Sequence, residues 1–200
     1  MKKLMLVLIL LISTNAFASE LTVTQQGGWV KTANNKSQDT WQSNTRLEYP
    51  IWREFALGAE FNYQGRQYFD SVDDPKGAFG SLLGYGFMGD LIFRPKVVGN
   101  FSPYVIGGLG YFIWDFKENP FLQDNQVTVD VENSMAAKIG VGADIKIAPR
   151  WSLNLEFNYF TAQIDARAYD HDNSPWNVVH DDGNIGNETW NFLAGLKYEF

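Results

Sequence analysis

The chain has 200 residues, a formal net charge of −7, no cysteine and an aromatic content of 16%. This length fits one domain, and the acidic balance argues against nucleic acid as a partner. The missing cysteines exclude disulfide bonds, a thiol nucleophile and a thiolate metal site.

The amino terminus has the pattern of a secretion signal. Lys2 and Lys3 precede an unbroken apolar stretch from Leu4 to Ile12, and Ala16-Phe17-Ala18 is the small-x-small pattern of a signal-peptidase site. This stretch is far shorter than the ~20 apolar residues that a retained anchor needs to cross a bilayer. We expect residues 1–18 to be a cleaved signal peptide and residues 19–200 to be the mature domain, which could reside in a membrane only through strands.

Alternation of apolar and polar residues predicts eight strands. Their expected ranges are 21–33, 40–49, 55–67, 79–94, 103–116, 134–147, 151–165 and 188–200. The connectors 50–54, 95–102 and 148–150 are short, whereas 70–78, 117–133 and 166–187 are longer and polar, and 34–39 is polar but brief. An exported barrel with both ends in the periplasm needs three short turns and four outer loops. The predicted fold is therefore all-β, an eight-stranded antiparallel up-and-down transmembrane β-barrel.

Alternation alone leaves open which face points inward, since a lipocalin-like soluble barrel has apolar residues inside. The apolar face is almost free of charge, which favours contact with lipid. The polar face carries many glycines, which make room for large side chains in a narrow interior: Gly58, Gly84, Gly86, Gly140, Gly142 and Gly195.

Aromatic residues gather where the strands should meet the two lipid interfaces. The predicted girdle at the short-turn end contains Phe55, Phe93, Tyr104, Trp151, Tyr198 and Phe200. The predicted girdle at the long-loop end contains Trp41, Tyr63, Phe79, Trp114, Tyr159 and Trp190. The strand at 103–116 is apolar on both faces down to Asp115, so its own register is ambiguous.

With the polar face inside, the lumen holds charges of both signs. The candidate charge network is Arg46, Glu48, Glu60, Asp90, Lys138, Asp144, Lys146, Glu156, Lys197 and Glu199. Unpaired charges in a confined interior are costly, so we expect cross-strand ion pairs rather than a selective ion pathway. An eight-stranded barrel is only just wide enough for side chains to fill, which favours a plugged lumen over an open pore.

The 148–150 turn sets the register of the two strands that it joins. Pairing about this turn places Glu156 opposite Gly142 and Asp144 opposite Asn154. Lys138 then lies one step too far outward for easy contact with Glu156. The expected partner of Glu156 is a basic residue across the barrel, such as Arg46 or Lys197.

Some positions on the lumen face are apolar, namely Leu82, Met88, Ile92, Phe160 and Leu193. They are compatible with an apolar pocket in the outer half of the barrel or with ordinary packing, and the sequence leaves both open.

Signals of catalysis are sparse. The two histidines, His171 and His180, lie among aspartates in the last long connector. A divalent cation site or an acid–base pair is conceivable there, but the spacing matches no defined metal loop. No serine lies in a recognisable nucleophile motif. We expect a solvated loop and no catalytic, cofactor or metal site.

Parts of the carboxyl-terminal half resemble the OmpW family of small eight-stranded outer-membrane barrels. The resemblance lies in Ser102–Tyr111, the strand Ala136–Asp144, the run Pro149–Asn154 with Tyr159, and the terminal Gly195–Phe200. It implies a narrow hydrophobic lumen that passes or binds small apolar molecules and releases them sideways into the membrane. It also implies that Trp190, Tyr198 and Phe200 form the terminal signature that outer-membrane assembly machinery recognises.

Three classes of function remain. The first is a narrow channel or binder for small hydrophobic molecules, and the second is a structural or adhesion barrel with a plugged lumen and functional outer loops. The third, a lipid-modifying enzyme, is disfavoured because both histidines lie in a loop. The expected location is the outer membrane of a Gram-negative cell envelope. The expected partners are outer-membrane lipid, lipopolysaccharide, the assembly machinery and, for the first class, a small hydrophobic ligand.

Overall fold

The computed structural model describes residues 21–33, 38–70, 78–95, 99–118, 127–170 and 177–200. The predicted signal peptide at residues 1–18 lies outside them. In the described chain the strands are β1 (Thr22–Thr32), β2 (Thr40–Trp52), β3 (Phe55–Asp70), β4 (Ala78–Phe93), β5 (Phe101–Glu118), β6 (Val127–Val131), β7 (Ser134–Ala148), β8 (Trp151–Asp170) and β9 (Asn177–Glu199). No helix in these ranges is long and apolar enough to span a membrane.

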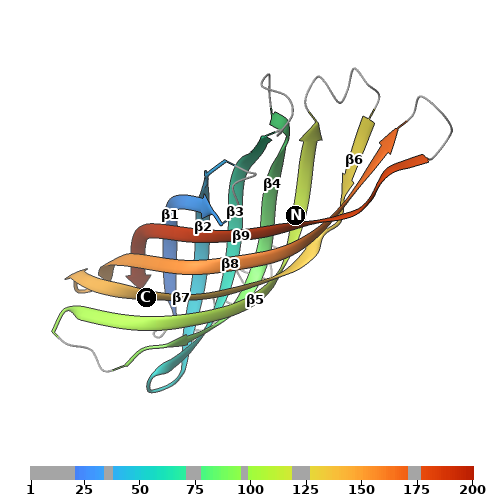
Figure 1. The fold of residues 1–200 in the computed structure, drawn as a ribbon. Helices are drawn as coiled ribbons and strands as arrows, with labels where there is room; N and C mark the ends of the chain where they lie inside the picture. The colour runs from blue at the N-terminus through green and yellow to red at the C-terminus, as the bar shows by residue number, and fades with distance from the viewer. Residues whose placement is uncertain (1–20, 34–37, 71–77, 96–98, 119–126, 171–176) are drawn as a thin grey trace, which may run out of the picture.

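The strands form one closed antiparallel barrel (Figure 1). Each of β1 to β5 pairs with its neighbour in sequence, β5 pairs with β7, and β7 pairs with β8. β9 closes the wall by pairing with both β8 and β1. β6 and β7 both pair with β8, at successive heights, so they share one position in the wall. The described wall therefore has eight positions, and the predicted fold class is confirmed.

The wall extends further beyond the outer girdle than the sequence predicted. The expected loop 166–187 is largely a hairpin, in which Ala166 pairs with Gly183 and Ala168 with His180. β6 occupies part of the expected loop 117–133. In Figure 1, β8 and β9 extend beside β6 at the end away from the carboxyl terminus, and Val127 of β6 pairs with Asp170 at the end of β8. The backbone hydrogen bonds continue even along the outer part of β9, where side-chain alternation fades, because ladder pairing requires no apolar face outside the membrane.

The two faces of the wall are assigned by exposure. Arg46 on the inner face is 0% exposed, whereas Leu109 on the outer face is 67% exposed. A water-soluble barrel would have the opposite arrangement. The predicted orientation, with apolar side chains outward, is therefore confirmed.

Two of the predicted girdle residues point inward instead. Tyr104 and Trp114 are only 2% and 6% exposed and face the lumen. Their strand is apolar on both faces, so alternation could not fix its register. Glycines on neighbouring strands accommodate both rings, because a Cβ at Gly142 would overlap Tyr104 and one at Gly84 would overlap Trp114.

The other girdle predictions agree with the structure where it describes the side chain. Those that lie on the outer wall are Trp41, Phe55, Tyr63, Phe93, Trp151, Tyr159, Trp190, Tyr198 and Phe200. The side chain of Phe79 lies outside the described part.

Candidate functional site in the barrel lumen

A buried guanidinium forms the centre of the lumen. Arg46 on β2 contacts the carboxylates of Glu48 at 2.9 Å, Glu60 at 3.3 Å and Glu156 at 2.7 Å. Arg46 and Glu156 lie on strands that are not neighbours, so this pair crosses the barrel. Glu156 thus meets Arg46, one of the two cross-barrel partners that the sequence indicated.

Two lysines extend the ion-pair network in opposite directions. Lys138 contacts Glu60 at 2.6 Å and Asp90 at 3.2 Å. Lys197 contacts Glu48 and Asp144, each at 2.9 Å. Together with Arg46, these residues connect opposite sides of the barrel through charge-assisted contacts.

Arg94 joins the network although sequence reasoning did not include it. Its guanidinium contacts Glu48 at 2.7 Å and Asp144 at 3.4 Å. Strand alternation could have identified Arg94. Every second residue of β4 from Leu82 to Ile92 faces the lumen, and Arg94 is the next residue in that series.

Lys146 and Glu199 do not belong to the buried network, contrary to the sequence prediction. Their side chains are 48% and 44% exposed, and they contact each other at 3.7 Å. Both residues stand at the ends of their strands, where the barrel opens to solvent. Alternation correctly assigns both residues to the inner face of the wall. A side chain on that face is buried only if it lies away from the open end of the barrel.

Neutral hydrogen bonds complete the central cluster. Glu156 accepts hydrogen bonds from Tyr104 at 2.9 Å and Asn158 at 2.8 Å. Asn154 donates to Tyr104 at 3.0 Å and accepts from Gln26 at 2.6 Å. The Tyr104 ring also lies 5.7 Å from the Arg46 guanidinium carbon. The Tyr104 ring, which the sequence placed in the girdle at the lipid interface, is therefore part of the lumen core.

The outer half of the lumen is divided into an apolar and a polar wall. The apolar wall, formed by β4, β5, β7 and β8, is one buried cluster of Leu82, Met88, Phe112, Trp114, Ala136, Phe160, Ala162 and Ile164. Phe112 lies 5.4 Å from Trp114 and 5.0 Å from Phe160, measured between ring centroids. The polar wall, formed by β9, β2 and β3, carries buried amides and hydroxyls, among them Thr40, Gln42, Asn62, Gln64, Asn187, Thr189 and Asn191.

The five predicted apolar lumen residues are all buried but do not form one group. Leu82, Met88 and Phe160 belong to the outer cluster. Ile92 packs with Ala56, Tyr104 and Ile106 in a second, smaller cluster. Leu193 is buried on β9 and belongs to neither cluster.

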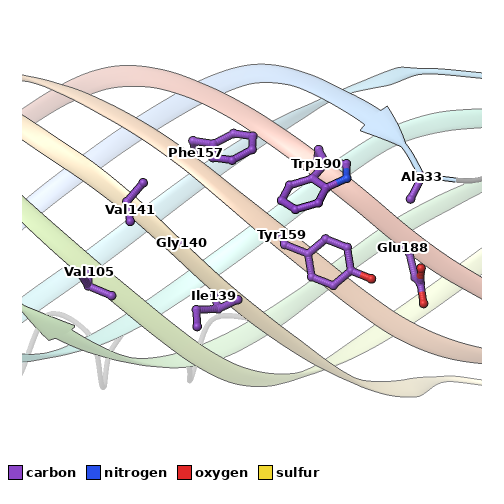
Figure 2. A pocket seen from close by; sticks show the side chains of 9 residues that line it. All are labelled: Ala33, Val105, Ile139, Gly140, Val141, Phe157, Tyr159, Glu188 and Trp190. Carbon is purple, nitrogen blue, oxygen red and sulfur yellow. The ribbon is translucent and has the colours of Figure 1, made fainter.

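The cross-section of the barrel is closed at mid-height. One side chain from each of the eight wall positions demonstrates this, and none is more than 6% exposed: Gln26, Arg46, Glu60, Met88, Tyr104, Lys138, Glu156 and Leu193. A groove of about 630 Å³ lies on the outer wall instead, lined by Ile139, Val141, Phe157, Tyr159 and Trp190 among others. Figure 2 shows these lining side chains. These side chains face the membrane rather than the lumen.

The outer wall is interrupted beside the apolar cluster. β5 pairs with β7 from Phe101 to Phe112, and no ladder in the described residues joins its last six residues to β6. Side chains bridge this seam, since the Trp114 amide donates to Asn133 and the Val129 amide donates to Glu118. Asp115 and Lys117 are exposed at the seam, which places it above the aromatic girdle rather than in the hydrocarbon region.

The histidine cluster discussed from the sequence falls largely outside the structure. His171 lies outside the described residues, and for His180 only the backbone is described. Among side chains that are described, no group of three His, Cys, Asp or Glu residues could hold a metal ion.

Comparison with known proteins identifies the family. Residues 4–200 match the outer membrane protein β-barrel domain. The chain belongs to this family. A comparison with curated protein sequences found no match.

Solved structures of other outer-membrane barrels share the fold. OprG from Pseudomonas aeruginosa has a TM-score of 0.68 at 13% identity, with 92% of this chain and 97% of that chain covered. Neisserial surface protein A has a TM-score of 0.59 at 12% identity, with 90% and 97% covered. Outer membrane protein W of E. coli has a TM-score of 0.56 at 17% identity, with 92% and 98% covered. The resemblance to OmpW seen in the sequence agrees with these matches.

This outer-membrane family membership settles the location and the meaning of the two faces. The protein is an outer-membrane β-barrel, its exposed apolar wall faces lipid, and its ion-pair network is enclosed within the lumen.

Proposed function

We propose that this outer-membrane barrel has a plugged lumen and acts as a structural or adhesive surface protein, with its function carried by the outer parts of its strands. The observation that carries the proposal is the closed cross-section at Arg46, Tyr104 and Glu156. An open pore would leave lumen side chains in contact with water, and breaking the buried ion pairs to open one would be costly.

Conductance across a planar bilayer tests this function. The refolded protein should give no ion-conducting steps, with or without small hydrocarbons. A variant with Tyr104→Ala and Glu156→Ala removes two central groups, and it should conduct if it still shows a heat-dependent gel shift. Conductance steps from the wild-type protein, as frequent as those from this variant, would contradict a plugged lumen.

The outer apolar cluster favours a second candidate, the binding of small hydrophobic molecules. It comprises eight buried apolar residues in an otherwise polar lumen, and it adjoins the unpaired seam between β5 and β6. A small hydrocarbon could enter at the seam and displace part of this packing, while the ion pairs close the route below. The charged residues at the seam favour entry from the outer surface over sideways release into the membrane.

Tryptophan fluorescence distinguishes the two candidates. Trp114 is the buried tryptophan of the cluster, so hydrocarbon binding should change emission in the wild type and not in Trp114→Phe. Equal responses from both proteins, or no response, would leave the plugged surface barrel as the supported function.

The remaining expectations belong to the same proposal. Residues 1–18 are removed during export, and the barrel performs no catalysis. Lipopolysaccharide and outer-membrane lipid surround the wall, and the assembly machinery recognises Trp190, Tyr198 and Phe200. Mass measurement of the mature protein tests the cleavage, which should leave Ser19 as the first residue.

A further inference from the structure

The lipid-facing wall of β1 and β2 carries a polar group that extends from mid-membrane depth, at Thr45, toward the outer girdle, where Ser43 pairs with Tyr63. Gln25, Ser43 and Thr45 all point outward, because Thr24, Gln26 and Asn44 between them are buried in the lumen. Thr45 lies midway along β2 between Trp41 and Tyr49, and Gln25 pairs directly with Thr45. We call Gln25, Ser43 and Thr45 the polar trio.

The trio satisfies only part of its own hydrogen-bonding capacity. Gln25 donates to the Ser43 hydroxyl at 3.1 Å, and Thr45 donates to the Gln25 amide oxygen. The second amide hydrogen of Gln25 has only a long contact of 3.5 Å with the Gln26 carbonyl. The Ser43 hydroxyl accepts in this arrangement, and its own hydrogen meets no acceptor among the described residues. Donors and acceptors therefore both remain at the surface.

The depth of Gln25 and Thr45 limits what could satisfy the unpaired groups of the trio. Water and lipid headgroups are absent from the hydrocarbon region, and polar groups left unpaired there are costly. Only another membrane-spanning protein can bring hydrogen-bonding groups to this depth. A second protein can approach the wall closely here, because Gly27 pairs with Ser43 and Ala194 and these small residues leave a shallow depression in the surface. Trp29, Trp41 and Phe192 stand around it, each more than half exposed.

We propose that the polar trio is the centre of an interface between two copies of this barrel. An amide and two hydroxyls both donate and accept, so the set is complementary to itself, as a twofold interface requires. Copies inserted by the same route have the same orientation, and their trios lie at the same depth. Polar side chains joined across small residues are a recognised means of association within membranes.

Single cysteines provide an unambiguous test, since the chain has none of its own. Ser43→Cys places a thiol at the trio. Val141→Cys is the matched control, because Val141 is lipid-exposed near the middle of β7, four wall positions away from β2. Each purified variant is reconstituted in lipid vesicles, diluted with lipid, and treated with a short thiol-to-thiol cross-linker.

Ser43→Cys should give at least roughly threefold more cross-linked dimer than Val141→Cys, the factor expected from one average hydrogen bond within a membrane. Adding Gln25→Leu should reduce the excess to the control level while the heat-dependent gel shift remains. If Gln25→Leu prevents folding, the isosteric Thr45→Val replaces it in the test. Equal cross-linking at both positions, or an excess that survives loss of the polar groups, would overturn the interface.

Discussion

Arg46 is the central cation of the lumen, and its replacement by methionine tests whether ion pairs hold the barrel closed. In the described lumen, the buried network has four cations, Arg46, Arg94, Lys138 and Lys197. It has five carboxylates, Glu48, Glu60, Asp90, Asp144 and Glu156. Arg46→Met leaves three cations against five carboxylates and removes the nearest cation of Glu156. We expect a loss of about 3–5 kcal/mol in the free energy of unfolding, the usual effect of breaking a buried pair.

Removing Glu156 should cost less than removing Arg46. Loss of Glu156 leaves no buried cation unpaired, because Arg46 keeps Glu48 and Glu60. Glu156→Gln leaves four cations against four carboxylates, and its amide can still bond to Tyr104 or Asn158. The expected loss is about 1.5–3 kcal/mol, the range for a hydrogen bond to a charged group.

Urea unfolding in lipid vesicles, followed by tryptophan fluorescence, measures both effects as shifts in the midpoint at constant slope. Leu47→Met is the control, because Leu47 is the outward neighbour of Arg46 and a volume-conserving change there should cost under about 1.5 kcal/mol. An Arg46→Met midpoint equal to wild type, or a Glu156→Gln variant weaker than Arg46→Met, would refute the reasoning.

Three further predictions concern packing, assembly and closure. Gly84→Ala should destabilise by about 1–3 kcal/mol because its Cβ would overlap the Trp114 ring, whereas Gly107→Ala on the lipid face meets no atom within 4 Å and should be neutral or slightly stabilising in the same unfolding assay. Deleting Phe200 should lower the amount of barrel in the outer membrane, measured by fractionation, and unchanged levels would contradict an assembly role. The folded barrel should resist mild SDS at room temperature and change its gel mobility on boiling, because a closed sheet has no free edge; recovery from the periplasm without detergent would count against this.

The sequence was sufficient for the membrane-spanning wall because two physical requirements act together there. Lipid on one side and a polar lumen on the other impose alternation at every residue, and a short turn fixes the register of its two strands. The predicted pairings of Glu156 with Gly142 and of Asp144 with Asn154 are both present.

Alternation failed where one of these requirements was absent. β5 is apolar on both faces, so Tyr104 and Trp114 could not be assigned to the lumen from their own strand. The large side chains of β5 face glycines on β4 and β7, and this pairing of ring with glycine was the available signal. Outside the membrane, the outer part of β9 lacks alternation, and the alternating segments of β6 and outer β8 are short and lie in polar, Asp- and Asn-rich stretches, so all three were interpreted as loops.

Contacts across the lumen were the least predictable part of the site. Neighbouring strands are related by turns, but Arg46 and Glu156 are brought together by the tilt and stagger of the whole closed wall. The sequence could indicate that Glu156 needs a distant cation, and it left Arg46 and Lys197 as alternatives. Lys197 instead contacts Glu48 and Asp144, nearer the short-turn end.

The position of the network has a consequence for how this barrel specifies its structure. Lipid is as apolar as the outward side chains, so burial of the outer wall against lipid favours the membrane without favouring one register over another. Contacts between side chains in the lumen must therefore select the strand register. Glu60, Lys138, Arg46 and Glu156 join β3, β7, β2 and β8, so a slip of one residue in any of these strands would move a charge to the lipid face. Such a slip of β2 or β7 is costly because a midplane Lys or Arg in lipid costs about 2–4 kcal/mol, and a slip of β3 or β8 exposes a Glu at a smaller cost. The charged residues that close the lumen therefore also penalise a one-residue slip of the strands that carry them.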